Sequence, residues 1–319
     1  MDIAPGIWIA MAVVAQVIWA CGNYLDNYLL KRYRNITQES GPGTIIFISS
    51  FTAAFVAFCI AIGAGILPIL GFEGRTELSV TPLQALKGLS IGVLQICWMI
   101  AYLYALDESD ETQSVPLFQS VPIFALLIGV HFDEIPPLIH IIGSLIIIAG
   151  ALVLNFHLST MRLNKSVIVL MLGASFMVAL IAFLFKNGAE ATNFFAAAFW
   201  LKLGLALAGI TVCYVVPSYR RQFNHVMNNR DWTGLTINIV NEVCDRVARL
   251  IFFGAIMLGP SVMSVQATAA YQPMFIFLIG LLLARNGSAF HAEHYTRDEV
   301  IKKGCGVALI AVGSYFIFT

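Results

Sequence analysis

Four ionisable residues lie within eight positions of an otherwise apolar segment, "INIVNEVCDRVARLIFFGAIML" at 237–258. They are Glu242, Asp245, Arg246 and Arg249. Each acid precedes an arginine by four positions, so the two pairs can meet on one face of a helix. The acids could hold an ammonium group or a proton, and the arginines could hold an anionic group. The segment predicts either mutual neutralisation or reversible binding of a charged small molecule.

The composition indicates where this segment lies. Hydrophobic residues make up 59% of the 319 positions and charged residues 11%, with a mean hydropathy of +0.83. Soluble proteins carry about 25% charged residues, so this chain lacks the polar surface of a water-exposed globule. We expect a polytopic membrane protein. The net charge of zero gives no electrostatic reason to expect nucleic acid as a partner.

The fold class that we expect is all-α. A membrane-spanning helix needs about 20 apolar residues, and Gly, Pro, Asn and charged residues separate runs of that length. The ten predicted transmembrane helices are 6–30, 43–67, 84–106, 113–132, 137–157, 166–186, 192–216, 233–258, 261–284 and 300–318.

The four charges cannot lie at the membrane surface. If Arg249 did, residues 250–258 would have to cross alone, and they rise only about 14 Å. An isolated charge at the centre of a spanning helix costs about 3 kcal/mol on insertion scales. Two interpretations stay open: the charges only pair with one another, or they line an aqueous cavity that binds substrate.

Polar and aromatic residues recur at helical spacing in other spans. In span 6–30, Gln16, Trp19, Asn23 and Asp26 follow one another at intervals of three, four and three. Similar stripes precede a proline in spans 113–132 and 261–284, and packing between helices is the alternative explanation for each stripe. The predicted substrate-binding residues are Trp19, Asn23, Asp26, Gln95, Trp98, Tyr102, Gln119, Glu242, Asp245, Arg246, Arg249, Tyr271 and Gln272.

The two halves of the sequence resemble each other. "LFQSVPIFALLIGV" (117–130) aligns with "TAAYQPMFIFLIGL" (268–281), which pairs Pro122 with Pro273. The following spans each carry two glycines seven positions apart. These are Gly143 and Gly150 in the first half, and Gly306 and Gly313 in the second.

The repeat predicts an inverted architecture. Residues 1–159 and 160–319 each hold five predicted spans, and an odd number inserts the second copy from the opposite side. We expect two inverted five-helix repeats that form one transport domain, with a site near the membrane midplane between them.

Several motifs resemble those of a known family. "YALD", a short link and "VPLFQSVPIFALLIGVHFDE" are similar to the EamA-like domain of the drug/metabolite transporter superfamily, with Ala105–Leu106, Pro122 and Glu134 at the family's typical positions. The second half departs from the pattern, because no Glu follows "LIGLLLA" and about twelve residues are inserted before the last span. The resemblance implies a transporter and leaves its substrate open.

Lys and Arg predict the orientation, because they gather in cytoplasmic loops. Twelve lie in the loops on one side, and three lie in the other loops and termini. The count predicts that both termini are non-cytoplasmic, in a bacterial-type inner or plasma membrane, although family members often have both termini inside. We expect Lys202, near the start of a span, to reach the surface with its long side chain.

The expected function is secondary transport by alternating access of a small zwitterionic or anionic metabolite, with coupling to protons or to a counter-substrate left open. The alternative is a flippase or transporter for a lipid-linked headgroup. An enzyme is not expected, because no His lies near the middle of a span and no HExxH-like motif occurs. We expect no cofactor and no metal site, and the six cysteines show no paired spacing. The expected partners are the substrate and the lipid bilayer, for a monomer or homodimer.

Overall fold

The computed structural model describes residues 6–37, 42–68, 76–108, 117–155, 165–285 and 297–318. Within these ranges the chain is helical apart from short connections and contains no strand, so the expected all-α class is confirmed. The helices are α1 (Ile7–Thr37), α2 (Gly43–Ile66), α3 (Pro82–Glu108), α5 (Val121–His131), α6 (Leu138–Asn155), α7 (Lys165–Ala191), α8 (Phe194–Val215), α9 (Pro217–Asn228), α10 (Trp232–Leu258), α11 (Val262–Ala267), the 3₁₀ turn η1 (Thr268–Ala270), α12 (Tyr271–Arg285) and α13 (Arg297–Phe318).

Six segments of the described chain are long and apolar enough to cross a membrane. They are Ile7–Thr37, Gly43–Ile66, Pro82–Glu108, Lys165–Ala191, Phe194–Val215 and Val262–Gly280. The expected spans 113–132 and 137–157 contain the shorter apolar helices Val121–His131 and Leu138–Val153. The remaining two expected spans coincide with α10, which carries the four charges, and α13. Multiple membrane-crossing helices are therefore present.

Side-chain caps fix where several helices begin. Asn193 accepts a hydrogen bond from the backbone of Ala196 at the start of α8, and Asp231 accepts one from Gly234 at the start of α10. After α10, Ser261 caps α11 by accepting from Ser264. Capping supplies acceptors for backbone N–H groups that the first turn leaves free. The short "GP" connection can thus end one helix and begin the next.

The long break between the seventh and eighth expected spans contains a helix that the sequence analysis did not predict. In α9, the buried residues Tyr219, Gln222 and Val226 are three and four positions apart, which is one helix face. The other positions include the exposed Arg220 and Arg221. A short helix with one buried and one basic face is typical of the membrane interface.

The two helices with aligned prolines are interrupted at equivalent places. A turn at 119–120 precedes α5, which has Pro122 in its first turn. The 3₁₀ turn η1 precedes α12, which has Pro273 in its first turn. Proline cannot donate a backbone hydrogen bond and disfavours helical geometry in the residue before it. The matched prolines therefore give both helices a break within the bundle.

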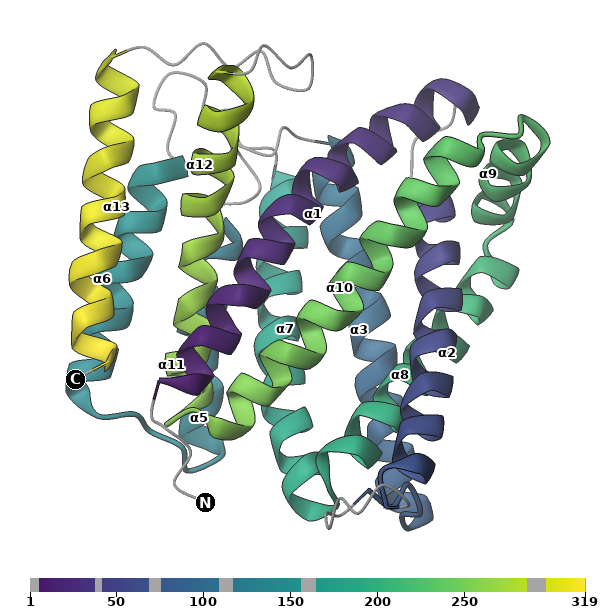
Figure 1. Cartoon of the computed structure of the whole chain (residues 1–319), viewed down its shortest axis with the longest axis horizontal. Coiled ribbons are helices and arrows are strands. Elements are labelled where there is room, and N and C mark those ends of the chain that lie inside the picture. Colours follow the sequence, from purple (N-terminus) through teal and green to yellow (C-terminus); the bar gives the residue numbers. More distant parts are fainter. Residues whose placement is uncertain are drawn as a thin grey trace.

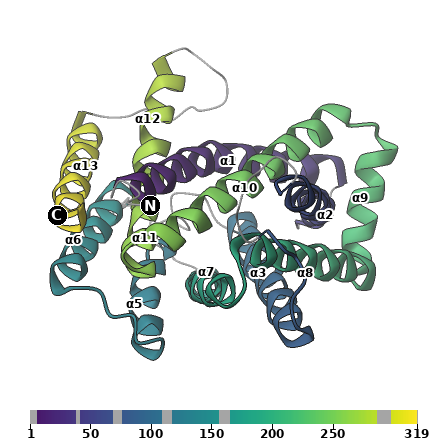
Figure 2. The same ribbon diagram turned by 60° about the horizontal axis from the view of Figure 1, so that its bottom comes forward.

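Five helix pairs make the most extensive contacts in the bundle: α1 packs on α10, α3 on both α7 and α8, α2 on α8, and α6 on α13. Figure 1 shows α1 and α10 crossing in front, with α6 and α13 side by side at one edge, and Figure 2 shows α3, α7 and α8 together behind them. We call the end where α1 begins and α13 ends the lower face, and the opposite end, where α9 lies, the upper face (Figure 1).

Glycines allow close contact between α6 and α13. A Cβ atom built on Gly143 would lie 2.7 Å from the carbonyl oxygen of Gly313, and one built on Gly150 would lie 2.7 Å from that of Gly306. Any larger side chain would force the helices apart. Small residues at such contacts are typical of helix packing in membranes.

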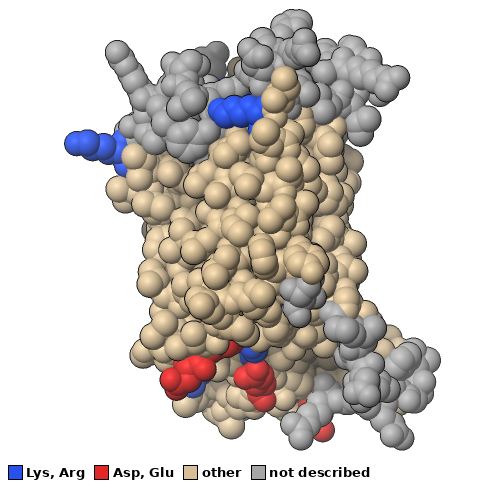
Figure 3. Space-filling view, turned by 90° about the vertical axis from the view of Figure 1, so that its left-hand side faces the viewer, with Lys and Arg blue, Asp and Glu red and all other residues tan. Residues whose placement is uncertain are grey.

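The exterior is apolar around the middle of the molecule. Figure 3 shows a face with few charged side chains in its central band, Lys and Arg near the upper face, and both Asp/Glu and some basic groups near the lower face. On α2, Phe51, Phe55 and Phe58 are 51%, 59% and 61% exposed. Their spacing of four and three makes one outward face that suits lipid.

Candidate substrate site

The four charges of α10 form one paired cluster. Arg246 donates to Glu242 at 2.7 Å and to Asp245 at 2.8 Å, and Arg249 donates to Asp245 at 2.8 Å. Both pairs expected from the four-residue spacing are present, and Arg246 joins them through Asp245. Two carboxylates and two guanidinium groups make the cluster neutral when all four are ionised. Pairing of this kind lowers the free energy of holding charges inside the bundle.

The two arginines have different surroundings. The side chain of Arg246 is 1% exposed and also donates to the Ser49 hydroxyl of α2. Arg246 therefore lies behind the cluster, enclosed by protein. The side chains of Arg249 and Asp245 are 11% and 24% exposed and reach a cavity.

The cavity encloses about 1270 Å³ of space not occupied by atoms, part of it open to solvent. Helices α1, α2, α3, α5, α7 and α10 line it together with the α11–α12 segment. Its aromatic lining residues are Trp19, Trp98, Tyr102, Phe118, Phe252 and Phe253. This space could hold a small molecule that has both an apolar part and a charged group.

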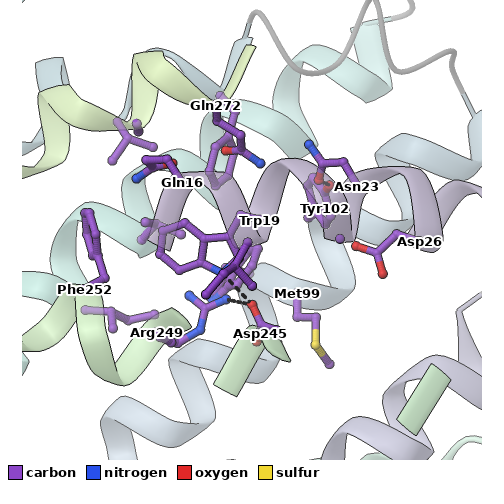
Figure 4. A pocket seen from close by; sticks show the side chains of 18 of the residues that line it. Gln16, Trp19, Asn23, Asp26, Met99, Tyr102, Asp245, Arg249, Phe252 and Gln272 are labelled. Carbon is purple, nitrogen blue, oxygen red and sulfur yellow. Dashed lines mark hydrogen bonds and ion pairs between the residues drawn. The ribbon is translucent and has the colours of Figure 1, made fainter. Parts of the chain in front are cut away.

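Tryptophans enclose the guanidinium group of Arg249. Its central carbon lies 5.4 Å from the Trp19 ring centroid and 4.9 Å from that of Trp98, in the range of cation–π contacts. Trp19 also donates from Nε1 to Asp245 at 2.9 Å, which Figure 4 shows beside the Arg249–Asp245 pair. These contacts orient the cation and its carboxylate partner at the cavity wall.

Three buried donors of cavity-lining residues, the Gln16 amide among them, have no hydrogen-bond partner among the described residues, and two of the three lie at this wall. Those two are Nε of Arg249 and Nε1 of Trp98. Buried polar groups normally have partners, and a missing one points to water or a ligand. Both donors would suit an acceptor such as a carboxylate oxygen.

A second polar group lies further along α1. Asn241 donates to Asp26 at 2.7 Å, and the Tyr102 hydroxyl donates to Asn23 at 2.8 Å. Figure 4 shows Asn23 and Asp26 on α1 beyond Trp19, away from Arg249. The cavity thus has a cation-bearing end and an end with a carboxylate and amides.

Nine of the thirteen predicted site residues line the cavity. They are Trp19, Asn23, Asp26, Trp98, Tyr102, Glu242, Asp245, Arg249 and Gln272. Gln16 and Gln266, which belong to the same polar stripes, line it as well. Helical spacing brings these residues together because each lies on an inward helix face at the depth of the cavity.

Four predicted residues do not line the cavity: Gln95, Gln119, Arg246 and Tyr271. Gln95 shares a face with Trp98 but lies about a turn earlier on α3, and helical spacing predicts a face and not a depth. Gln119 lies in the turn before α5, where helical spacing no longer applies. The hydroxyl of Tyr271 donates a hydrogen bond to the hydroxyl of Ser314 on α13 instead.

Sequence reasoning missed two residues that belong here. Asn241 lines the cavity, and its position four before Asp245 was a usable signal. Lys202 was expected to reach the surface, but the structure corrects this expectation, because its side chain is 0% exposed on α8. A lysine reaches water only if its helix face is turned outward, and the face of α8 that carries position 202 is buried in the bundle.

Charged pairs tie helix ends together at both faces. At the upper face, Arg32 of α1 holds Asp231 through two hydrogen bonds, of 2.7 and 2.5 Å. The Arg32 guanidinium lowers the pKa of the Asp231 carboxyl below its usual value. At the lower face, Glu134 accepts from Lys186 of α7 at 3.0 Å and from the backbone N–H of Val262 at 2.5 Å.

Aromatic stacking fills the space between the cavity and the lower face. Phe253, which lines the cavity, stacks on Phe185 with ring centroids 3.9 Å apart, and Phe132 stacks on Phe183 at 5.3 Å. Together with the Glu134 contacts, these rings link α5, α7 and the α10–α11 hairpin below the cavity.

The fold and the site define a helical membrane protein with a charged cavity inside the bundle. Residues 43–156 match the model of the EamA-like transporter family, part of the drug/metabolite transporter superfamily, so the predicted resemblance is confirmed. Over this segment the chain is similar to the EamA-like transporters. That family is generally non-enzymatic.

Similarity of structure extends further than the family match. A protein whose title reads only "Crystal structure of protein" aligns with 98% of this chain and 95% of its own, with a TM-score of 0.62 and 15% sequence identity. At that identity the likeness describes the fold alone. No protein in the curated set matches the sequence significantly.

Proposed function

We propose that this protein is a secondary transporter that carries a small zwitterionic or anionic metabolite with an apolar part across the membrane by alternating access. The observation that carries the proposal is the Arg249–Asp245 pair, which faces an aromatic cavity inside a membrane bundle. Charged groups at membrane depth mark substrate or ion pathways by default.

The proposal includes ten spans in two inverted repeats, residues 1–159 and 160–319. The helix pairing supports it: if α1, α2, α3, α5 and α6 correspond to α7, α8, α10, α11–α12 and α13, the α1–α10 contact maps onto the α7–α3 contact. The α2–α8 and α6–α13 contacts then map onto themselves. A twofold axis in the membrane plane produces this pattern.

The glycine contacts agree with the same axis. Under the repeat alignment, Gly143 corresponds to Gly306 and Gly150 to Gly313. The contact of Gly143 with Gly313 therefore maps onto that of Gly306 with Gly150, and both are present.

The two ends of the cavity suggest how a substrate is held. The anionic group would bind at Arg249 and Trp98, whose donors lack partners among the described residues. An ammonium group would bind at Asp26 and Asn23, and the apolar part would pack on the rings between them. Because acidic and basic groups lie together at the cavity wall, the site should bind a zwitterion or an anion better than an organic cation.

The orientation also belongs to the proposal. The Lys and Arg count favours an upper face in the cytoplasm and both termini outside it. In that case the aromatic stack and the Glu134 contacts would close the non-cytoplasmic side.

A thermal-shift screen of the purified protein tests the proposal. The panel contains amino acids, sugar nucleotides, polyamines and phospholipid headgroups, and we expect stabilisation by zwitterions or anions. Each hit is then tested for counterflow in proteoliposomes, which requires a site open to each side in turn. Stabilisation by polyamines alone would contradict the proposal, and stabilisation by phospholipid headgroups alone would favour the lipid-headgroup alternative.

A further inference from the structure

Gln16 on α1 carries a buried amide that the proposed binding site does not use. Its side chain is 0% exposed, and neither Nε2 nor Oε1 has a hydrogen-bond partner among the described residues. Buried polar groups normally have partners, because leaving one unpaired is unfavourable. Packing alone would be served better by leucine or methionine, which fill similar space without a buried amide. The amide therefore points to a hydrogen-bond partner inside the cavity.

The amide lies at the cavity wall, one helical turn from the Arg249 site. Gln16 lines the cavity and precedes Trp19 by three positions on the same face of α1, a rise of about 4.5 Å. The Trp19 ring contacts Arg249, with 5.4 Å between the guanidinium carbon and the ring centroid. In the view of Figure 4, Gln16 lies on one side of Trp19 and Arg249 on the other. A ligand whose anionic group binds at Arg249 can thus reach Gln16 with a second group a short distance away.

Two further carboxamides line the same cavity from the interrupted helix of the second half. Gln266 belongs to α11 and is 2% exposed, and Gln272 belongs to the first turn of α12. Figure 4 shows Gln272 on the same side of Trp19 as Gln16. These three amides offer hydrogen-bond donors and acceptors that carry no charge. They form a third polar part of the cavity, different from the cation-bearing end and from the end with a carboxylate.

The chemistry of an amide selects its partner. Nε2 of Gln16 can only donate, and Oε1 can only accept. A ligand carboxylate would satisfy Nε2 alone, an ammonium group would satisfy Oε1 alone, and an alkyl group would satisfy neither. A ligand carboxamide satisfies both, because its carbonyl oxygen accepts from Nε2 while its N–H donates to Oε1. The paired geometry makes a carboxamide the best match for this side chain.

We propose that Gln16 binds a carboxamide group of the substrate, so that the transported molecule carries an uncharged amide close to its anionic group. The inference rests on the proposed transport function and narrows its substrate class. The anionic group binds at Arg249 and Trp98, and the carboxamide pairs with Gln16 about one helical turn away. Recognition uses hydrogen bonds alone, and no covalent bond or protonation state changes.

The test uses three carboxylate probes of the same chain length: glutaramate, 5-oxohexanoate and 5-methylhexanoate. Their far ends are a carboxamide, a methyl ketone and an isopropyl group of similar shape. Because none carries an ammonium group, binding does not require the carboxylate end of the cavity. Calorimetric titration of the purified full-length protein gives the three affinities. We expect glutaramate to bind about tenfold more tightly than 5-methylhexanoate, as two net hydrogen bonds imply. The ketone, which only accepts, should lie between them.

Variants assign this preference to Gln16. Gln16→Met keeps the length of the side chain and removes both hydrogen-bonding atoms, so the ratio of the glutaramate and 5-methylhexanoate affinities should fall about tenfold. If Gln16→Met does not fold, Gln16→Asn replaces it, because the shorter side chain withdraws the amide from the ligand. The matched control is Gln95→Met. Gln95 is 1% exposed, and its amide also lacks a partner among the described residues, but it lies outside the cavity lining. Gln95→Met should leave the ratio unchanged.

The outcomes separate the inference from the transport proposal. The inference is overturned if the wild type binds glutaramate and 5-methylhexanoate equally well, or if the preference persists in the Gln16 variant. It is also overturned if Gln95→Met reduces the ratio as much as Gln16→Met does. In each of these cases the carboxylates still bind, and the transport proposal stands. If no probe binds the wild type, the proposed substrate class is wrong, and the inference fails with it.

Discussion

At the residue scale, Arg249 and Arg246 have the same charge and different surroundings. One faces the cavity, and the other is enclosed by Glu242, Asp245 and Ser49. Removing the first should affect ligand binding, and removing the second should affect folding. The two arginines can therefore be distinguished by experiment.

Arg249→Ala should weaken binding of anionic or zwitterionic ligands about 10- to 100-fold, which corresponds to the loss of a charged hydrogen bond of about 1.5–3 kcal/mol. Calorimetric titration with the best ligand of the screen measures the change. Arg220→Ala, at an exposed position of α9, is the matched control. Unchanged affinity in a folded Arg249→Ala protein would show that this residue does not bind the substrate.

Arg246→Met should destabilise the folded protein by about 3–5 kcal/mol, because it leaves Glu242 buried without its partner. The double variant with Glu242→Gln should recover part of that loss, since no uncompensated charge then remains. Melting temperatures in detergent, followed by size-exclusion fluorescence, give the comparison. A double variant less stable than Arg246→Met would argue against the pair as the cause.

The site residues show what a single sequence can predict. The stripe of Trp19, Asn23 and Asp26 was predicted from spacing, because an inward helix face repeats every three or four positions. Spacing gives no depth and no neighbour, so it could not show that Gln95 lies outside the cavity lining. The same limit hid the burial of Lys202, which depends on how α8 is turned against α2, α3 and α7.

At the element scale, the α6–α13 contact depends on the absence of side chains. Gly143→Leu should destabilise the protein by about 1–3 kcal/mol or more, the usual effect of overpacking, because its Cβ would lie 2.7 Å from the Gly313 carbonyl. Gly63→Leu on α2 is the control, since no atom lies within 4 Å of a Cβ built there. Equal melting temperatures for the two variants would contradict the close contact.

The connection between α1 and α10 should respond to pH through Asp231. Its pKa is lowered by Arg32 in the folded state, so its contribution to stability is complete above the unfolded pKa of about 3.9 and is lost as the pH falls through the folded value. Asp231→Asn keeps an acceptor for the cap and removes the charge. The difference in melting temperature between wild type and Asp231→Asn should be present at neutral pH and disappear at the acid end of a titration. A difference that persisted there would assign the effect to the cap.

Most of the helices could be predicted from the sequence, but the breaks within and between them could be predicted only in part. Apolar runs gave most helices of the bundle within a few residues, because length and hydropathy decide which segments suit lipid. Helix α1 ends seven residues after its expected end, and α5 begins eight residues after its expected start. Helix α9 was missed, because only Tyr219, Gln222 and Val226 are buried in a mostly polar stretch and its hydrophobic face is formed by contact with other helices. The break before Pro122 was indicated by the proline itself.

At the scale of the whole molecule, orientation can be tested with single cysteines in a cysteine-free background. If the Lys and Arg count governs insertion, Arg220→Cys in α9 should react with a membrane-impermeant thiol reagent only from the cytoplasmic side. Leu83→Cys, an exposed position at the start of α3, should react only from the other side. The reverse pattern would show that both termini are cytoplasmic, as they often are in the family, and that the Lys and Arg count gives the wrong orientation.

One carboxylate at the lower face joins the two halves of the chain. Glu134 belongs to the first half, and both of its partners, the Lys186 ammonium and the Val262 backbone N–H, belong to the second. Separation of the two halves at the lower face would leave the Lys186 ammonium and the Val262 N–H without their acceptor at the same time. Water would then have to accept both hydrogen bonds. Both hydrogen bonds use the same acceptor side chain, so the loss of the Glu134 carboxylate would remove both of these contacts between the halves at once.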